Sequence, residues 1–250
     1  MATALRQASN EATERHLREQ VAACTLLLND LDILGYSGHV SARLPRGDAF
    51  LIQSFDQSRA SLGPDDLLIC DLDGKMLAGR QGLKPPSEVF LHCEILRARQ
   101  DVDAVAHFHH DVATVFTLVE GAVLAPIKNH AVRWASGIPV HPDPSHISDP
   151  ALGRAVTATL GTHHALLIRA HGQIVAAETV KALLIDCIHF VENAEAMYRA
   201  AALGRVVPLS EAEIAAFLGD FDRDRHIGKL WKYYVGRGRA SGVLPHDWTL

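Results

Sequence analysis

The sequence predicts an α/β protein with one mixed sheet that is covered by helices on both faces. Helical and strand patterns alternate along the whole chain, which is typical of this class. At least one hairpin breaks the alternation, so the sheet cannot be purely parallel. The chain has 250 residues, of which 48% are hydrophobic, and this is enough to bury a sizeable core.

The first half of the chain contains two predicted helices and two predicted strand regions. Apolar residues at steps of three and four predict a helix over about 11–34 that ends at Gly35. Residues 49–55 and 66–79 have the composition of strands, and an Asp-Gly pair predicts a tight hairpin in the second region. We expect the next helix to begin with Ser87 as its cap, because the two prolines before it cannot continue an earlier helix.

The second half alternates in the same way. Its predicted elements are a strand at 102–109, a short helix near 112–119, a proline-rich surface loop at 139–150, a helix with Asp149 as cap and Pro150 in its first turn, two strand segments within 164–178, a long helix over about 178–203, and a helix opened by the capping box "SEAE" at 210–213.

Charge and composition exclude several classes of partner. Twenty-four Lys and Arg residues face 29 Asp and Glu residues, a net charge of -5, and no long basic run occurs, so nucleic acid is not expected as a partner. The first twenty residues lack the apolar core of a signal peptide, and no stretch reaches the length of a membrane span. We therefore expect a cytoplasmic protein with no membrane contact. The four cysteines form no C-x-x-C pair, which is typical of reduced thiols.

Three histidines occur within four positions in "VDAVAHFHHDV", residues 102–112. Strand side chains alternate between the two faces, so His107 and His109 point one way and His110 the other. The pair could hold a metal ion, or the rings could be hydrogen-bonded structural histidines. His171 is a third candidate ligand if its strand end lies beside the first, and otherwise a polar residue at a solvated turn. A catalytic zinc-type site can have three imidazole ligands and one open position that takes water or substrate.

Glu88 is the candidate for moving protons. Its position in the first turn of a predicted helix has an ordinary explanation, because the helix dipole favours carboxylates there. A metal-dependent lyase also needs a carboxyl group beside its ion. Burial and neighbouring groups in a cleft would raise the pKa of such a carboxyl group.

The spacing of these residues resembles that of the class II aldolase/adducin family. Glu88 lies nineteen residues before the His-x-His pair, "GHVSAR" lies upstream, and "AHGQIVAAETVKALLIDCIHFVENAE" lies downstream. The resemblance spans about residues 11–205. It implies a three-layer α/β/α fold around a mixed, largely antiparallel sheet, with a single domain over 1–250 and a helical, aromatic tail at 206–250.

The resemblance also assigns roles to residues. It implies that His107, His109 and His171 bind a divalent metal ion, and that Glu88 is the acid/base. Zinc suits three histidines best, with manganese, iron or cobalt as alternatives. His110 falls outside the family motif. The family further implies a homotetramer whose active sites lie between subunits and take a small-molecule substrate.

The substrate-binding stretches depart from those of the sugar-phosphate members. Those members hold phosphate with a Gly-Asn loop and with paired serines before the glutamate, whereas here His39 stands at the asparagine position and Pro86 replaces the first serine. Proline offers neither a hydroxyl nor an N–H, so a phosphate group would lose donors. The remaining candidates for binding a substrate are His39, Ser41, Arg43 and Ser87. Arg43 could instead form an internal salt bridge.

These departures favour one branch of the family. They predict a metal-dependent carbon–carbon lyase that decarboxylates a hydroxylated, non-phosphorylated aromatic or heteroaromatic carboxylate. An aldolase or epimerase acting on a small hydroxy-keto or sugar-phosphate compound is the alternative, because it would use the same ligands. A third hypothesis is a non-enzymatic, adducin-like interaction module, in which loss of metal ligands would be expected.

Overall fold

The protein is built around one eight-stranded sheet. The computed structural model describes residues 2–250, with side chains from residue 11 onward. The strands are β1 (His39–Arg43), β2 (Ala49–Gln53), β3 (Leu67–Asp71), β4 (Met76–Ala78), β5 (Ala104–Phe108), β6 (Val140–His141), β7 (Ala165–Ile168) and β8 (Gly172–Ala177). Their order in the sheet is β4-β3-β2-β1-β5-β8-β7-β6. Only the pair β6 and β7 is parallel among these strands, so the predicted mixed, largely antiparallel sheet is confirmed.

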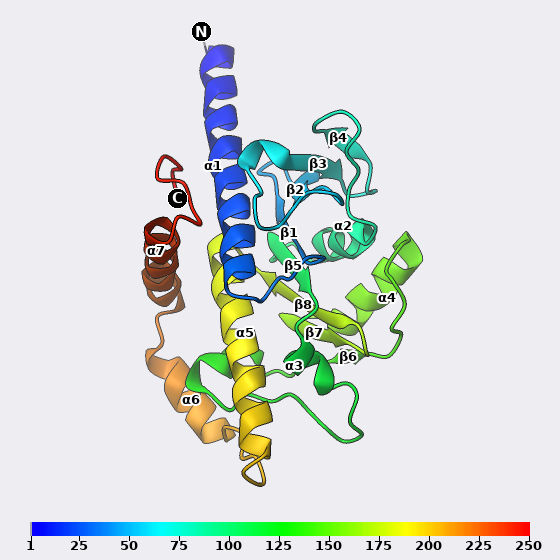
Figure 1. Ribbon diagram of the computed structural model, residues 1–250, viewed down its shortest axis with the longest axis vertical. Coiled ribbons are helices and arrows are strands. Elements are labelled where there is room, and N and C mark those ends of the chain that lie inside the picture. The colour runs from blue at the N-terminus through cyan, green and yellow to red at the C-terminus, as the bar shows by residue number, and fades with distance from the viewer. Residues whose placement is uncertain (1) are drawn as a thin grey trace.

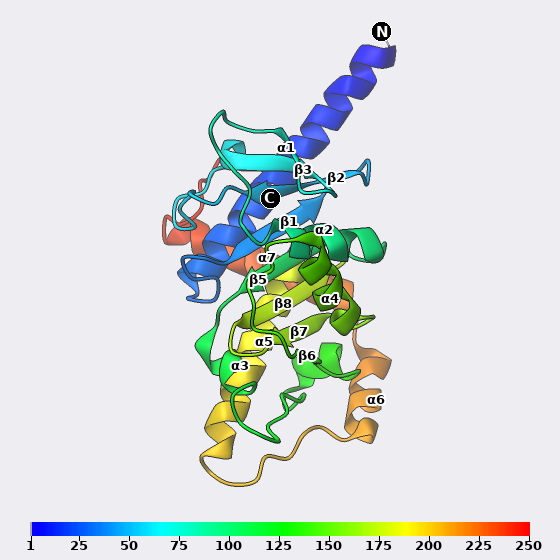
Figure 2. The same cartoon turned by 90° about the vertical axis from the view of Figure 1, so that its right-hand side faces the viewer.

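Helices cover both faces of this sheet. The helices are α1 (Ala2–Asp30), α2 (Val89–Ala98), α3 (Asp111–Val115), α4 (Pro150–Leu160), α5 (Val180–Ala201), α6 (Glu211–Asp220) and α7 (Arg223–Ala240), with short 3₁₀ helices η1 (Pro64–Asp66) and η2 (Asn129–Trp134). Figure 1 shows α1, α5 and α7 on one side of the sheet and α2 with α4 on the other. Figure 2 faces the α2 and α4 side. The predicted three-layer α/β/α architecture is therefore confirmed.

Alternation along β5 separates the two hydrophobic cores. Ala104, Ala106 and Phe108 pack in the core under α1 and α5, whereas Val105 packs in the core under α2 and α4. Because strand side chains alternate, His107 faces the same side as Val105. This places His107 on the face that the start of α2 also covers.

Two strands escaped the sequence analysis. β1 has polar residues at every second position, namely His39, Ser41 and Arg43, and this alternation over five residues is itself a strand pattern, although no strand was predicted there. It nevertheless lies in the middle of the sheet, and its residue His39 pairs with His107 of β5. β6 is a two-residue strand within the predicted loop at 139–150.

Two predicted helix boundaries were wrong. The first helix ends at Asp30, before the predicted end at Gly35. α2 begins at Val89 with Glu88 in the capping position, and no side chain caps it. Ser87 instead places its hydroxyl 3.3 Å from Nε2 of His146.

Other local predictions are confirmed. Asp149 caps α4 by accepting hydrogen bonds from two backbone N–H groups, and Ser210 opens α6 with a capping box. All four cysteines are free and buried. The hairpin between β3 and β4 turns at Gly74, whose φ of 80° suits glycine. Among residues 2–250 no helix has the length and apolar character needed to cross a membrane.

Candidate metal centre

Four side chains predicted from the sequence converge at one end of the central strands. They form the His–Glu cluster: Glu88, His107, His109 and His171. One ligand atom of each lies within 4.8 Å of the ligand atoms of the others. His107 lies in β5 and His109 follows directly after this strand. His171 lies in the turn between β7 and β8, and Glu88 is the residue before α2. They meet because β5 and β8 are antiparallel neighbours, which brings the end of one beside the start of the other.

The turn that carries His171 depends on two neighbouring residues. Ala170 has a φ of 53°, so the left-handed position is taken by an alanine and not by the glycine that follows. Gly172 instead permits close approach. A Cβ atom there would lie 2.5 Å from Cδ2 of His109 and 2.6 Å from the carbonyl oxygen of Phe108.

Gly172→Ala is therefore expected to weaken metal binding by more than about tenfold, because the added methyl group must displace His109 or the end of β5. Zinc titration of the apo-protein measures this. Gly236→Ala is the control, since Gly236 on α7, like Gly172, has no positive φ and a Cβ atom there meets nothing within 4 Å. Equal zinc affinity of the Gly172→Ala variant and the unmodified protein would contradict the assigned role.

Hydrogen bonds orient the two imidazoles of the His-x-His pair. Nδ1 of His107 lies 3.0 Å from the carbonyl oxygen of Gln173, which can only accept. A neutral His107 therefore carries its proton on Nδ1 and leaves Nε2 with a free lone pair. Nδ1 of His109 lies 2.8 Å from the hydroxyl of Ser37, and the two Nε2 atoms are 2.9 Å apart. Inward-facing Nε2 atoms with outer nitrogens hydrogen-bonded fit a metal centre.

Glu88 lies among these rings and is buried. Its Oε2 is 3.3 Å from Nε2 of His107, and its Oε1 is 3.5 Å from Nε2 of His171. The backbone N–H of Ile147 donates a hydrogen bond to Oε1. Burial alone would raise the pKa of Glu88, but the neighbouring His107 and His171 and the backbone N–H of Ile147 hold it well below its usual value. The expected rise in pKa is therefore wrong, because the histidine neighbours outweigh burial.

His39 belongs to a buried chain of polar groups. Its Nδ1 lies 2.7 Å from Nε2 of His92, whose Nδ1 lies 2.6 Å from the hydroxyl of Ser41. Burial and the neighbouring His92 lower the pKa of His39 well below its usual value, and burial with the nearby His107 lowers that of His92 to about 3. Both rings are therefore neutral at ordinary pH. A neutral His39 cannot attract an anion by its charge, and Ser41 lies behind it, bonded to His92.

Arg43 has the internal role that the sequence left open. Its Nε donates to a carboxylate oxygen of Asp103 at 2.9 Å. Its terminal nitrogens donate to four backbone carbonyl groups, those of Gly47, Leu96, Arg99 and Val102. Arg43 also lies at the opposite end of β1 from His39. We therefore exclude it from the candidate substrate site, because its donors hold the loops at the far end of the strand.

A pocket of about 210 Å³ opens beside the His–Glu cluster. It is lined by Tyr36, Ser37, His39, Phe55, Arg59, Pro86, Ser87, Glu88, His109 and His146. Arg59 was not predicted from the sequence, where it is a single arginine in the loop after β2. Its Nε donates to the carbonyl oxygen of Gly38, and one terminal nitrogen donates to the carbonyl oxygens of Phe55 and Gln57. These bonds hold the guanidinium group in the wall of the pocket.

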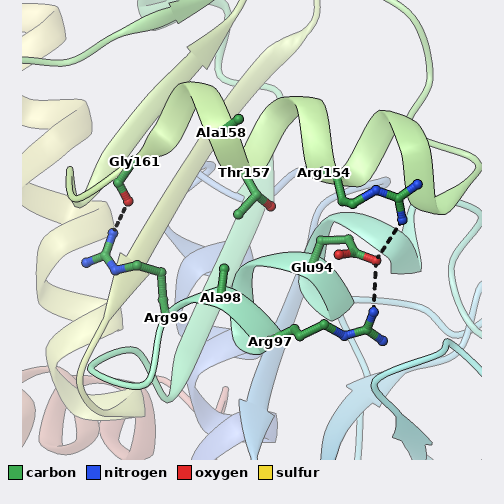
Figure 3. A pocket seen from close by; sticks show the side chains of 8 residues that line it. All are labelled: Glu94, Arg97, Ala98, Arg99, Arg154, Thr157, Ala158 and Gly161. Atoms are coloured by element: carbon green, nitrogen blue, oxygen red, sulfur yellow. Dashed lines mark hydrogen bonds and ion pairs between the residues drawn. The ribbon is translucent and has the colours of Figure 1, made fainter.

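A larger cavity, of about 510 Å³, lies between α2 and α4 (Figure 3). Its charged groups pair with one another or with the backbone. Glu94 faces both Arg97 and Arg154, and Arg99 donates to the carbonyl oxygen of Gly161. Histidine and cysteine are absent from the residues that line it. We therefore place the candidate active site in the smaller pocket.

Comparison with known proteins decides the family. A profile of the class II aldolase and adducin N-terminal domain matches residues 18–198. The chain belongs to the class II aldolase and adducin family. The matched region contains all four residues of the His–Glu cluster and ends within α5.

Two relatives and one solved structure show the range within this family. The 3,4-dihydroxyphthalate decarboxylase of Arthrobacter keyseri is 27% identical over 241 residues, which are 92% of this chain and 96% of that enzyme. The 5-methylthioribulose-1-phosphate/5-deoxyribulose-1-phosphate aldolase of Rhodospirillum rubrum is 29% identical over 182 residues, or 72% and 79% of the two chains. L-fuculose 1-phosphate aldolase from Glaciozyma antarctica PI12 shares the fold with a TM-score of 0.81 at 18% identity, covering 93% and 92%.

Family membership shows which class of enzyme the protein belongs to. This class II aldolase family member is a lyase, because its relatives are aldolases, dehydratases and decarboxylases. The hypothesis of a non-enzymatic module is therefore not supported. Class II aldolases use a divalent metal, and the His–Glu cluster is a possible site for one. Three imidazole nitrogens and a carboxylate group suit such an ion.

Proposed function

We propose that the protein is a metal-dependent decarboxylase of a hydroxylated aromatic or heteroaromatic carboxylate that carries no phosphate group. The observation that carries the proposal is the lining of the pocket beside the His–Glu cluster. Tyr36 and Phe55 are 92% and 55% exposed at this pocket, and Arg59 lies in its wall. Aromatic faces suit a planar ring, and a guanidinium group suits a carboxylate. Pro86 lines the same pocket and offers no donor to a phosphate group.

The three histidines of the cluster would hold the metal ion. Zinc is the first choice for this ligand set, and manganese, iron or cobalt would also accept imidazole. The ion would act as a Lewis acid on a substrate oxygen next to the carbon–carbon bond that breaks. The hydrogen bonds at the outer nitrogens of His107 and His109 would keep these two ligand rings in place.

Glu88 would move the proton in both directions. Its low pKa makes it a carboxylate in the free site, so it can accept the proton of the substrate hydroxyl group. It then returns this proton to the ring carbon that bears the substrate carboxylate. Carbon dioxide leaves, the electron pair of the broken bond stays in the ring, and the product oxygen takes a proton from water. A carboxyl group with a low pKa can thus still supply the proton that decarboxylation requires.

The substrate class is tested by product analysis. The metal-loaded protein is offered dihydroxylated aromatic carboxylates in one series and ketose phosphates in another, and released carbon dioxide and aldehyde are measured. We expect carbon dioxide from the first series and no aldehyde from the second. Turnover of ketose phosphates alone would contradict the proposed substrate class and leave the lyase assignment intact.

Arg59 is the proposed anchor of the substrate carboxylate. Arg59→Met should raise KM by about 10–100-fold, because a charge-assisted hydrogen bond is lost, with a smaller effect on kcat. Arg46→Met is the matched control, since Arg46 is an exposed arginine that pairs with Asp48 outside the pocket. An unchanged KM in the folded Arg59 variant would show that the carboxylate binds elsewhere.

We also propose that the protein assembles as a homotetramer with its pockets at subunit boundaries. Family membership supports this, as do Tyr36 and Phe55, which are large exposed aromatic side chains beside the pocket. Aromatic residues are enriched in protein interfaces. Light scattering on the purified protein measures the number of chains.

A further inference from the structure

A second group of metal-binding side chains lies outside the pocket, where η2 meets α5. Ligand atoms of His130, His189 and Glu192 all lie within 4.8 Å of one another. His189 and Glu192 are three residues apart on α5 and therefore share one face of the helix. His130 comes from η2, which packs against α5. We propose that these three residues, the α5 cluster, bind a second divalent metal ion of the zinc class, with water completing its coordination.

The packing of the rings supports a shared ligand. The rings of His130 and His189 stack with their centroids 4.2 Å apart, and the ring of His226 from α7 lies 5.4 Å from that of His189. Among the described residues, Nε2 of His130 is buried and has no hydrogen-bond partner, although it lies 3.3 Å from Oε2 of Glu192. The distance between Nε2 of His130 and Oε2 of Glu192 would allow a hydrogen bond, but the geometry of the two groups does not. A metal ion would satisfy this nitrogen and the carboxylate together.

The side chains differ in their access to solvent. The side chain of Glu192 is 44% exposed, whereas that of His130 is 16% exposed. Burial and the neighbouring His130 lower the pKa of His189 to about 3. A neutral imidazole is the form that binds metal ions. The cluster thus joins a partly buried and a buried imidazole to a carboxylate group that an ion can reach from solvent.

Cationic groups near the α5 cluster oppose a second cation. Nζ of Lys128 lies 3.3 Å from Oε2 of Glu192 and would have to give up this contact. Arg223 acts electrostatically on His189 and on His226, and Lys229 acts on His226. Removal of the Lys128 charge should therefore strengthen metal binding. A structural stack of histidines that binds no ion would not respond in this way.

The test uses a variant in which the His–Glu cluster has lost two of its histidines. Its outcome therefore does not depend on the proposed function. The full-length His107→Ala/His109→Ala variant is stripped of metal and titrated with Zn²⁺, and bound ions are counted by elemental analysis. We expect one ion per chain and a rise in Tm with added Zn²⁺, because the ion binds the folded state. Replacing Zn²⁺ by Co²⁺ should give visible absorption bands of a bound ion.

Further substitutions in this variant locate the ion. His189→Gln and Glu192→Gln should each weaken Zn²⁺ binding by more than about tenfold, and Lys128→Ala should strengthen it. His246→Ala, at an exposed histidine outside both clusters, should have no effect. If His189→Gln does not fold, Glu192→Gln decides, because the Glu192 side chain is more exposed than either imidazole and its replacement disturbs the packing less. Absence of bound Zn²⁺, or binding that both Gln substitutions leave unchanged, would overturn the proposal.

Discussion

Glu88→Gln is expected to lower turnover by about 10²–10⁴-fold, the usual contribution of a positioned acid/base. The amide keeps the shape of the side chain but cannot accept a proton from the substrate and return it. The measurement is kcat at saturating metal and substrate, with metal content determined in parallel. Metal should remain bound, because His107, His109 and His171 are unchanged.

A second glutamate on the same helix provides the control. Glu94 is also buried, and it pairs with Arg97 and Arg154 in the cavity between α2 and α4. Glu94→Gln therefore removes a buried carboxylate without touching the pocket and should leave kcat within about a factor of two to three of the original, since any cost falls on stability. Unchanged turnover in Glu88→Gln would remove the acid/base role.

His171→Ala is expected to weaken metal binding by more than about 100-fold and to abolish activity at ordinary metal concentrations. The loss follows because only His107 and His109 would remain as imidazole ligands. Removing a group that merely hydrogen-bonds to a ligand costs about 10–100-fold in metal affinity, and removing a ligand itself costs more. Zinc titration and activity at rising zinc concentrations measure the effect. Activity should return in part at high zinc concentration, because the substrate pocket itself is unchanged.

His146→Ala is the matched control for this substitution. The ring of His146 stacks over that of His171 at a centroid distance of 6.4 Å, and its Nε2 lies 3.8 Å from Oε2 of Glu88. It is nevertheless outside the His–Glu cluster, and its side chain is 56% exposed. Metal affinity should therefore be retained. Equal affinities in the His171→Ala and unmodified proteins would exclude His171 as a ligand.

The candidate ligands could be predicted because local patterns carry them. The alternation of a strand places His107 and His109 on one side, and the order of motifs along the chain brought Glu88 and His171 into the same hypothesis. The sequence alone could not show that β5 and β8 are neighbours. Their pairing is a tertiary fact, and the whole arrangement depends on it.

The substrate-binding residues were predicted less well, and for a physical reason. Arg43 and Arg59 look alike in the sequence, yet one holds loops at the far end of β1 and the other lines the pocket. The sequence also does not reveal that Nε2 of His92 lies 2.7 Å from Nδ1 of His39, or that both rings are buried. Charge and burial depend on neighbours that are distant in the chain, and periodicity does not reveal them.

The most direct test of the proposed metal centre is a crystal structure of the zinc-loaded protein with anomalous diffraction measured at the zinc edge. We expect a peak at the end of β5, bonded to Nε2 of His107, His109 and His171 at about 2.0–2.1 Å, with Glu88 facing the same open pocket. If the protein takes up zinc but shows no peak there, or shows a peak that the His171 ring does not reach, the three histidines do not form the metal centre.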